Sequence, residues 1–599
     1  MQVEDQQAIT ATDAVEAQPI EINIDFRRLL TRNVVLMLAL LLLGGMIRYY
    51  TINAAGFPIR DGALPYRAAR TVLDNGFRYP TVIPYNGGDF PFLYPPLGIF
   101  TAAAASQQFD IPLLDMFRYL PAFASALTVP VVYLLTRTLF GAKTLSFVAA
   151  LVYALMPSNV ILSITGGDVA TTPGLLFALL AIQQAYLLIV KRSENHLLPA
   201  ALLATLAFLF DLAMGAFAMN TALLLLVLHG RNRYSLLNWL LLVISTVILV
   251  GLWFFPIVII HTGRIYGAML SLATGGLSME TVVQLAISNV GGEVLIPIMT
   301  ILGMLGFFVF VARRRFLLPL WYLTTIVFLP TNAPLLVTVP LSIMVAVALV
   351  QLLFPLLADA SYKTYEDGIP ALRFARQEFV RNANKQIYHL PVYATAVVLL
   401  VYAIHSVYVS ANPLRDPQIP DAELEAMAWI NTNLPEDARF LVITDDDNWE
   451  TDTALDWFPV LANRESVINV RASLWDGTYR QQIGYYERLT DCKGSNIECL
   501  FALEEQIAID AGATQEETSE LTSADLVRLR SGAIQQATQP RLRVFDFVYV
   551  SVRERGALSG FIALDSQTET SYRSIRSEGG VLILQPVEDD PLDTSQFTQ

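Results

Sequence analysis

Residues 34–62 read VVLMLALLLLGGMIRYYTINAAGFPIRDG, an apolar run of membrane-spanning character that is followed about ten residues later by Arg60 and Asp61. Asp61 opens a long polar loop that continues through Asp89 to Tyr94-Pro95-Pro96-Leu97. A carboxylate close to the end of a span is costly unless it is hydrated, paired or functional. The stretch therefore predicts a membrane protein with carboxylates just outside its first span, and makes it a candidate for chemistry at the membrane surface.

The composition of the whole chain also indicates a membrane protein. Of 599 residues, 54% are hydrophobic and 15% are charged, and the mean hydropathy is +0.48. Nearly uncharged apolar runs, most of them long enough for a helix to cross a bilayer, recur eleven times, at about 34–50, 116–136, 144–162, 169–190, 197–211, 213–228, 235–260, 292–311, 316–330, 334–356 and 391–409. The runs within 197–228 and at 316–330 are short for a span. We expect an α-helical polytopic protein with about 11 transmembrane helices.

The basic residues indicate how these spans are oriented. Lys and Arg gather in every second loop, as is typical of cytoplasmic loops, with clusters at Arg27 to Arg32, Arg137 with Lys143, Lys191 with Arg192, Arg231 with Arg233, Arg313 to Arg315 and Lys363 to Lys385. The short loops between them hold almost none. We therefore expect a cytoplasmic N-terminus and an extracytoplasmic C-terminus in a multi-pass protein of the cell membrane.

Domain boundaries follow from the same pattern. Residues 1–26 are polar and acidic and lack the basic and apolar regions of a signal peptide, so we expect a disordered cytoplasmic tail. Residues 27–410 form the predicted transmembrane domain, and 51–115 form its first extracytoplasmic loop. Within this loop Pro95-Pro96 stops a helix, and the short apolar run 97–106 predicts a helix lying at the outer interface.

The composition changes after the last span. Residues 411–599 contain 33 Asp or Glu and 15 Lys or Arg, which predicts a separate, soluble, extracytoplasmic domain. Residues 421–433 have the pattern of an amphipathic helix, and 440–443, 544–552 and 581–585 have that of buried strands. We expect an α/β domain. Its Cys492 and Cys499 are either a disulfide in an oxidising compartment or two free thiols, and the choice depends on the topology.

Three carboxylates are expected on the outer face, and each has a structural alternative. Asp168, in Gly166-Gly167-Asp168, begins the fourth span, and its role could be limited to capping that helix. Asp61 could pair with an arginine or make an Asp-Gly turn, and Asp89 could belong to a Gly-Gly-Asp turn. In a helix bundle Asp61 and Asp168 could also share one outward cavity.

The order of these parts resembles a known family. An outer loop with an early aspartate and a helix opened by Tyr94-Pro95-Pro96-Leu97 is followed by Arg118-Tyr119-Leu120-Pro121, by Leu135 to Gly141, and by a second outer loop ending in Asp168. This order is similar to that of the GT-C class of integral-membrane glycosyltransferases, such as the protein mannosyltransferases and the lipid A aminoarabinose transferase. The resemblance covers residues 27–230 in motif order and the remainder in architecture.

The resemblance implies a reaction. Members of this class transfer a sugar from a polyprenyl-phosphate donor to an acceptor on the outer face, and the aspartate of their first loop is the expected base. That role falls to Asp61, with Asp168 as a second carboxylate and with Asp89 and Tyr94 as candidate acceptor-binding residues. The chain departs from the pattern at Asp61-Gly62, where many relatives carry an acidic pair, and at Tyr94, where they often carry a basic residue.

A second resemblance lies in the C-terminal domain. The order of Ala428-Trp429-Ile430, Leu434 to Ala438 and Trp457 to Arg464 is similar to the outer domain of oligosaccharyltransferase catalytic subunits, in which a tryptophan-rich segment recognises the acceptor. By this resemblance Trp457 and Arg464 are further candidate acceptor-binding residues. The alternative is that Trp457 is a packed core residue.

Cations are needed to neutralise the phosphate of the donor, and arginine binds two phosphate oxygens at once. Arg264, His261 and Arg60 are the candidates, because Arg264 and His261 are the basic residues of an otherwise uncharged outer loop. The alternative is that such arginines contact lipid headgroups at the interface.

Other classes of site lack their sequence patterns. No phosphate-binding GxxxxGK[ST], HExxH, CxxC or G-x-S-x-G motif is present, so no cofactor and no metal site are predicted. The acidic run from Asp445 to Asp452 could hold a divalent metal but has the pattern of a solvated turn. The expected partners are a polyprenyl-phosphate sugar donor, a lipid, glycan or protein acceptor, and membrane lipids, without nucleic acid.

Two rival functions fit part of the pattern. A transporter or flippase of lipid-linked or small solutes would carry charges near mid-membrane. Asp211 would have that character if 197–228 were one long buried element. A non-catalytic protein of the same architecture, presenting its outer domain to a partner, is the second rival.

Overall fold

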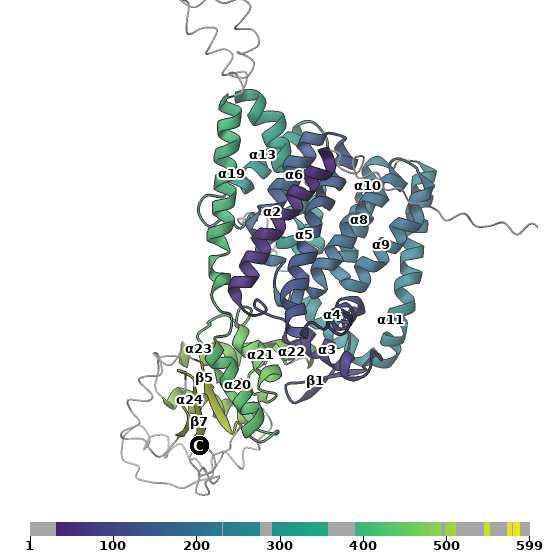
Figure 1. The fold of residues 1–599 in the computed structure, drawn as a ribbon. Coiled ribbons are helices and arrows are strands. Elements are labelled where there is room, and N and C mark those ends of the chain that lie inside the picture. The colour runs from purple at the N-terminus through teal and green to yellow at the C-terminus, as the bar shows by residue number, and fades with distance from the viewer. Residues whose placement is uncertain are drawn as a thin grey trace, which may run out of the picture.

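Two parts of unlike architecture make up the computed structural model of the chain, a bundle of long helices and a smaller part built around a β-sheet at one end of the bundle (Figure 1). The structure describes residues 32–230, 232–275, 290–357, 390–476, 478–492, 497–510, 544–551, 572–577 and 579–586. The expected tail at 1–26 and the basic cluster at Lys363–Lys385 lie outside the described residues.

Seven helical stretches among the described residues are long and apolar enough to cross a membrane, which confirms a helical membrane protein. They are α2 (Arg32–Ala55), α5 (Leu113–Phe140), α8 (Thr171–Ile189), α10 (Leu212–His229), α11 (Arg233–Gly275), α19 (Leu390–Ser410), and the stretch Ala333–Leu357, which contains α15 (Ala333–Leu336), α16 (Thr338–Ala348) and η3 (Leu349–Leu353). Each coincides with an apolar run of the sequence.

Four further apolar helices are shorter, and they coincide with the four remaining runs. They are α6 (Lys143–Ala154), α9 (Leu197–Phe210), α13 (Ile298–Ala312) and α14 (Leu317–Phe328). A helix crossing the hydrocarbon core needs about 20 residues, so these helices do not confirm eleven crossings. Helices α9 and α10 are separate and meet at Asp211, so 197–228 is not one long element.

Residue size and polarity explain why these helices assemble. Gly303 and Gly306 of α13 face α16, where a Cβ on Gly306 would lie 2.1 Å from the carbonyl oxygen of Met344. Small residues at such contacts let helix backbones approach closely inside a membrane. Large apolar side chains on the outside of the bundle remain exposed, among them Leu252 at 73% and Met46 at 69%. An apolar outer surface of this kind suits contact with lipid.

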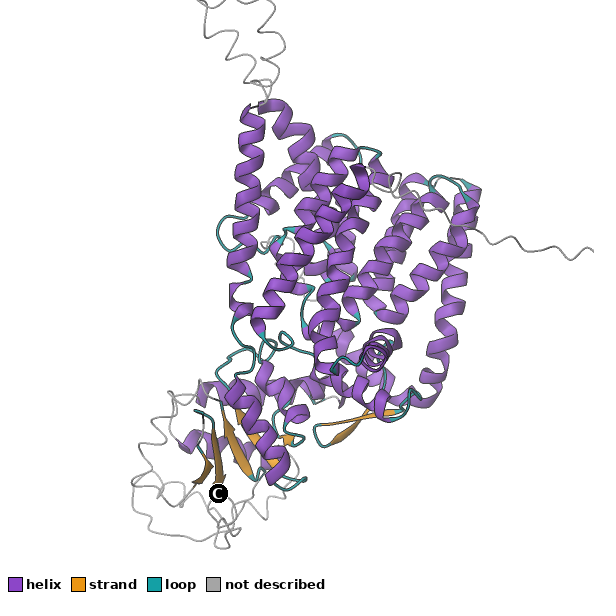
Figure 2. Ribbon diagram, viewed as in Figure 1, coloured by secondary structure: helices purple, strands orange, loops and turns teal. Residues whose placement is uncertain are grey.

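The loops at one end of the bundle form a compact layer. It contains α3 (Ala63–Asp74), the antiparallel hairpin of β1 (Val82–Tyr85) and β2 (Gly88–Pro91), α4 (Pro96–Phe109), α7 (Pro157–Leu162) and the short η1 (Gly166–Val169). Helix α4 is seen nearly end-on in Figure 2 while the bundle helices run along the page, so it lies across them. Asn86 and Gly87, both with positive φ, make the hairpin turn. Asp89 therefore lies on strand β2 and not in the turn that the sequence suggested.

The C-terminal part contains a five-stranded sheet with the order β4-β3-β5-β7-β6. The strands are β3 (Arg439–Ile443), β4 (Glu465–Ser466), β5 (Phe547–Val550), β6 (Tyr572–Arg576) and β7 (Leu582–Pro586). Strand β3 is parallel to β4 and β5, whereas β7 is antiparallel to β5 and β6. The predicted strands at 440–443, 544–552 and 581–585 coincide with β3, β5 and β7.

Helices accompany this sheet, as Figure 2 shows. They are α20 (Asp421–Asn433), α21 (Thr453–Leu461), α22 (Val470–Asp476), α23 (Tyr479–Cys492) and α24 (Ile497–Asp510). Cys492 and Cys499 form a disulfide that joins α23 to α24. Helices α21 and α22 lie on the side of the sheet that meets the loops of the bundle (Figure 1), and this junction is where the acidic residues of the outer loops gather.

Candidate active site

Two loops that are distant in the sequence, both predicted to be extracytoplasmic, meet at one end of the bundle. Ile59 and Thr165 form an isolated parallel β-bridge, and the backbone N–H of Gly166 donates to the carbonyl oxygen of Ile59 at 2.8 Å. A Cβ on Gly166 would lie 2.6 Å from the carbonyl oxygen of Asp61, and one on Gly167 would lie 2.9 Å from its Oδ2. The two glycines therefore permit the Asp61 carboxylate to approach the loop that carries Asp168.

Asp168 has a carboxyl with unusual protonation behaviour. Burial raises its pKa well above the usual range, the negative charge of Asp61 raises it further, and a hydrogen bond from Thr165 opposes both effects. Thr165 Oγ1 donates to Asp168 Oδ2 at 2.5 Å. The residue as a whole is only partly exposed, and burial of a carboxyl favours its neutral form.

Asp168 does not cap helix α8, because Ala170 is the N-cap residue and no side chain caps that end. Asp211 is the residue with a capping role, since its Oδ1 accepts from the backbone N–H groups of Ala213 and Met214 at the start of α10. Asp211 Oδ2 also accepts from Thr171 at 2.7 Å, and its charge contributes to the raised pKa of Asp168. A third carboxylate thus stands behind Asp168, at the outer turn between α9 and α10.

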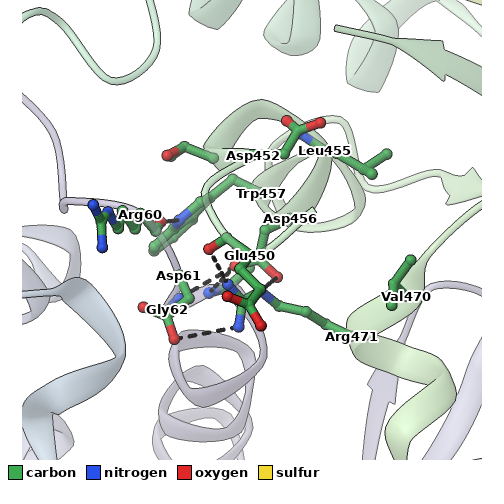
Figure 3. Close-up of polar contacts among 12 residues, drawn as sticks. Arg60, Asp61, Gly62, Glu450, Asp452, Leu455, Asp456, Trp457, Val470 and Arg471 are labelled. Carbon is green, nitrogen blue, oxygen red and sulfur yellow. Dashed lines mark hydrogen bonds and ion pairs between the residues drawn. The ribbon is translucent and has the colours of Figure 1, made fainter. Parts of the chain in front are cut away.

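The C-terminal part supplies a cation to Asp61. Nη1 of Arg471 on α22 lies 3.3 Å from Asp61 Oδ2, and its Nε lies 3.1 Å from Asp456 Oδ1 (Figure 3). Arg471 Nη2 donates to the carbonyl oxygen of Glu450 at 3.0 Å. Burial alone would lower the pKa of Arg471, but the two carboxylates outweigh it and raise that pKa. One guanidinium therefore joins the first outer loop to the C-terminal part.

Asp456 ties the two parts together a second time. Its Oδ2 accepts from the backbone N–H groups of Gly62 and Ala63, each at 3.2 Å, at the N-terminus of α3. An anion is favoured at that end of a helix. The side chain is only 2% exposed, and burial raises the pKa of the Asp456 carboxyl to about 6, against the opposing charge of Arg471. This contact fixes the backbone directly after Asp61.

Trp457 and Arg464 do not have the surface that acceptor binding requires. Trp457 is completely buried, its indole N–H donates to the carbonyl oxygen of Arg60 at 3.0 Å, and its ring packs against Phe57 and Tyr66. Arg464 is 3% exposed and donates to backbone carbonyls at the C-terminus of α20, those of Ile430, Asn431 and Leu434. The expectation of acceptor contact by these two residues is corrected: one is a core residue at the junction, and the other caps a helix end.

The remaining predicted residues lie at different distances from this centre. Tyr94 is close enough to Arg471 to influence the pKa of that guanidinium. Asp89 is exposed on strand β2. Arg60 has a left-handed backbone with φ of 57°, and its side chain points away from Arg471 in Figure 3. His261 and Arg264 are on α11 in a part whose side chains lie outside the described residues.

Other arginines of the outer loop have structural partners. Arg67 donates to the carbonyl oxygen of Pro84, Arg118 donates to those of Ile52 and Asn53, and Arg70 pairs with Asp74. These contacts account for the presence of arginines at this end of the bundle.

The acidic run after β3 is a hydrogen-bonded turn. Asp446 Oδ1 accepts from the backbone N–H of Asn448 and from the Thr451 hydroxyl, and Asp452 accepts from Thr444 and from Tyr486. Within the described part of the chain, no three His, Cys, Asp or Glu side chains are arranged to hold a metal ion. Asp452 also caps α21, the helix that carries Asp456 and Trp457.

Comparison with known proteins rests on the fold. No family model and no curated protein sequence matches the chain. The oligosaccharyltransferase of Archaeoglobus fulgidus in its apo form matches with a TM-score of 0.53 at 15% identity, over 93% of this chain and 75% of that one. ArnT from Cupriavidus metallidurans bound to undecaprenyl phosphate matches with a TM-score of 0.50 at 14% identity, over 93% of this chain and 99% of that one.

The chain has the GT-C fold. ArnT in its apo state gives the same result, with a TM-score of 0.51 at 12% identity over 92% of this chain and 97% of that one. At such identities the likeness concerns architecture, and the site must be argued from its own residues. The sequence resemblance to the GT-C class, which rested on motif order, is confirmed at the level of the fold.

Sequence reasoning missed Arg471 and Asp456. Asp456 precedes Trp457 inside the apolar segment Leu455–Leu461, and Arg471 stands between Val470 and Ala472. A charged residue within an apolar segment is a signal that it has a buried partner. Nothing in the sequence, however, indicates that the partner of Arg471 is a residue 410 positions earlier.

Proposed function

We propose that the chain is a membrane glycosyltransferase that moves a sugar from a polyprenyl-phosphate donor to an acceptor on the extracytoplasmic face. One observation carries the proposal: the loops that carry Asp61 and Asp168 are in contact at the end of a GT-C bundle, and the charge of Asp61 helps to raise the pKa of Asp168, after the larger effect of burial. Two neighbouring acids in unlike environments are a recurring arrangement in acid–base catalysis. The donor class is supported by the fold shared with ArnT, whose structure contains undecaprenyl phosphate.

The proposed topology has eleven spans within 27–410, a cytoplasmic N-terminus, and residues 411–599 as a soluble extracytoplasmic α/β domain. The disulfide between Cys492 and Cys499 supports this orientation, because disulfides persist in oxidising compartments. The bonds from Arg471 and Asp456 to the loop after α2 support it as well, since they require both parts on one side of the membrane.

The proposed reaction is a single displacement. The hydroxyl oxygen of the acceptor attacks the anomeric carbon, the bond from that carbon to the phosphate oxygen breaks, and the polyprenyl phosphate leaves with the electron pair. Asp61 accepts the hydroxyl proton as general base. Asp168, held neutral by burial, donates a hydrogen bond that orients the acceptor or the sugar. Inversion at the anomeric carbon follows, and isolation of a covalent glycosyl-enzyme would contradict it.

Arg471 positions the base in this scheme. Its guanidinium is already shared between two carboxylates and the Glu450 carbonyl, so it has little capacity left for a phosphate. The cations proposed for the donor phosphate remain Arg264, His261 and Arg60. The acceptor is a lipid, a glycan or a protein, with Asp89 and Tyr94 of the first loop as proposed contacts, and no cofactor enters the scheme.

The alternative function is transport or flipping of a lipid-linked or small solute. The division between α9 and α10 weakens it, because Asp211 is an N-cap at the outer turn and not a charge inside one long span. A non-catalytic role as a scaffold for a partner is the second alternative. Both are separated from the proposal by whether the donor is consumed.

The test follows label from a panel of radiolabelled polyprenyl-phosphate sugars, incubated with purified protein and host membranes. The variants are Asp61→Asn and, as matched control, Asp110→Asn, since Asp110 is an exposed aspartate of the same loop at the end of α4 and has no part in the proposed site. Turnover that falls at least a hundredfold in Asp61→Asn and stays near the wild-type rate in the control supports the proposal. Absence of donor consumption across the panel overturns it, and equal turnover in both variants removes Asp61 from the chemistry.

A further inference from the structure

A pair of aromatic side chains stands beside the candidate base on the C-terminal part. The guanidinium carbon of Arg471 lies 5.7 Å from the centroid of the Trp449 ring, and the Trp449 and Tyr479 rings are 5.9 Å apart at 79°. The path from Trp449 through Arg471 to Asp61 therefore spans about 10 Å at most. An acceptor end of one or two sugar rings covers that distance.

Trp449 and Tyr479 keep part of their surface accessible, although both also pack against the core of the C-terminal part. Trp449 and Tyr479 are partly exposed, whereas Trp457 is fully buried with its indole N–H donated within the protein. Glu450 follows Trp449 directly, is exposed, and is close enough to Tyr479 to help raise the pKa of that phenol, after the larger effect of burial. Aromatic faces and a solvated carboxylate thus occur together within reach of Asp61.

This combination matches the chemistry of a saccharide. The C–H face of a sugar ring is apolar and packs on an aromatic ring, whereas its hydroxyl groups donate to carboxylate oxygens. The edge strands of the sheet are β4 and β6, and β4 is the one that contacts the β1–β2 hairpin of the first loop, so a peptide acceptor that extends the sheet there would need the edge of β4. Asn86 covers that edge, because its side-chain amide donates to the Ser466 carbonyl at 2.9 Å and accepts from the Ser466 N–H at 2.7 Å.

We propose that Trp449, Tyr479 and Glu450 form a subsite for a saccharide acceptor, so that the acceptor of the reaction is a glycan. The inference rests on the proposed glycosyl transfer for its purpose, but the subsite binds a saccharide whether or not transfer occurs. Arg471 connects the subsite to the base, since it contacts the Trp449 ring and Asp61 with one side chain.

The chain offers a matched control for the central tryptophan. Trp429 on α20 is also partly exposed and also lies under an arginine, with the guanidinium carbon of Arg576 at 5.2 Å from its ring centroid. It belongs to a different pair of elements, α20 and β6. Trp449→Ala and Trp429→Ala therefore remove the same kind of cation–π contact, one at the subsite and one away from it.

The experiment measures binding of the full chain in nanodiscs to an array of neutral and acidic oligosaccharides, without any donor. Wild type and Trp429→Ala are expected to bind the same saccharide, and Trp449→Ala and Glu450→Gln to lose affinity, by about tenfold for the tryptophan. Trp449→Phe retains a ring and is expected to keep most of the affinity, which separates loss of the subsite from misfolding.

Several results would overturn the subsite. They are no saccharide binding by wild type at millimolar concentration, equal affinity of Trp449→Ala, and Trp449-dependent binding of extended peptides in place of glycans. The donor panel described above is scored separately. Saccharide binding without donor turnover would support the subsite and contradict the proposed transferase function. Donor turnover onto protein without saccharide binding would support the transferase function and contradict the subsite.

Discussion

Replacement of Arg471 by Met tests how the two parts of the molecule share one site. Met keeps much of the apolar stem and removes the charge, so Asp456 loses its ion pair while it stays almost fully buried, with 2% of its side chain exposed. Removing one partner of a buried pair costs about 3 kcal/mol or more. The contact to Asp61 adds less than about 1 kcal/mol, because that carboxylate is 36% exposed and solvent screens the pair.

The loss of stability in Arg471→Met should depend on pH, and the direction of this dependence follows from the pKa of Asp456. Burial raises that pKa to about 6, and Arg471 is the charge that opposes a further rise. At pH 7.5 the wild-type carboxyl is ionised and paired, so Arg471→Met loses the full interaction. At pH 5 the carboxyl is mostly protonated in wild type too, so the difference in stability between wild type and variant shrinks as pH falls through about 6.

The assay compares thermal unfolding midpoints of purified wild type, Arg471→Met, Asp456→Asn and the double variant at pH 5 and 7.5. Because the residues are in contact, the double variant should lose less than the sum of the single losses, by about 2 kcal/mol. Arg471→Lys should be intermediate in stability and poor in transfer, since an ammonium group lacks the planar fork that reaches both carboxylates. Equal stability of Arg471→Met and wild type at pH 7.5, or strict additivity, would refute the reasoning.

Three further predictions concern single positions. Gly167→Ala places a methyl group 2.9 Å from Asp61 Oδ2 and should reduce transfer at least tenfold with little change in the unfolding midpoint. The control Gly484→Ala, whose methyl group meets nothing within 4 Å, should leave transfer unchanged. Equal transfer rates in the two variants would show that the close approach of the two loops is unimportant. Burial raises the pKa of the Asp452 carboxyl to about 7, so the stability that this carboxyl contributes is present below about pH 4 and is lost as pH rises to 7. In Asp452→Asn the unfolding midpoint should therefore change less with pH over this range, by an effect of order 4 kcal/mol at most. An unchanged dependence of the midpoint on pH would contradict this prediction. Arg48 is fully buried in α2, donates to Ser125 at 2.5 Å and has no carboxylate partner among the described residues. Arg48→Met should therefore be tolerated better than Arg48→Asp in a comparison of folded yield, because Asp would be a buried charge without a partner. A higher folded yield of Arg48→Asp than of Arg48→Met would contradict this reasoning.

Hydropathy allowed the helices to be located from the sequence alone, because a span must satisfy its backbone within itself and expose apolar side chains to lipid. The run at 391–409, for example, became α19 (Leu390–Ser410). Helix length was less predictable: the run at 144–162 contains α6 and α7, separated near Pro157. A count of apolar runs therefore locates helices without establishing how many of them cross the membrane.

The candidate site was predictable where charge placement dictates it. Asp61 and Asp168 were expected at one end of the bundle, because each lies at a span boundary and the predicted topology puts both boundaries on the same side of the membrane. The structure brings their loops into contact. The roles of Trp457 and Arg464 were not predictable in this way. An aromatic or cationic residue after an acidic segment has the same sequence pattern whether it faces solvent or, as here, closes the junction between two parts of the protein.

The protonation of the site follows from where each acid is placed, and this explains why two aspartates of similar sequence context would have different roles. Burial of Asp168 in the loop that ends at α8, together with the neighbouring carboxylates of Asp61 and Asp211, raises its pKa well above the usual range. Asp61 is on the open side, more than a third exposed and 3.3 Å from the guanidinium of Arg471. Two loops of the bundle supply the two acids, but the cation comes from α22 of the C-terminal part. Loss of that part would therefore leave Asp61 beside Asp168 without its positive partner, so in the proposed reaction the C-terminal part is needed to position the base as well as to bind the proposed acceptor.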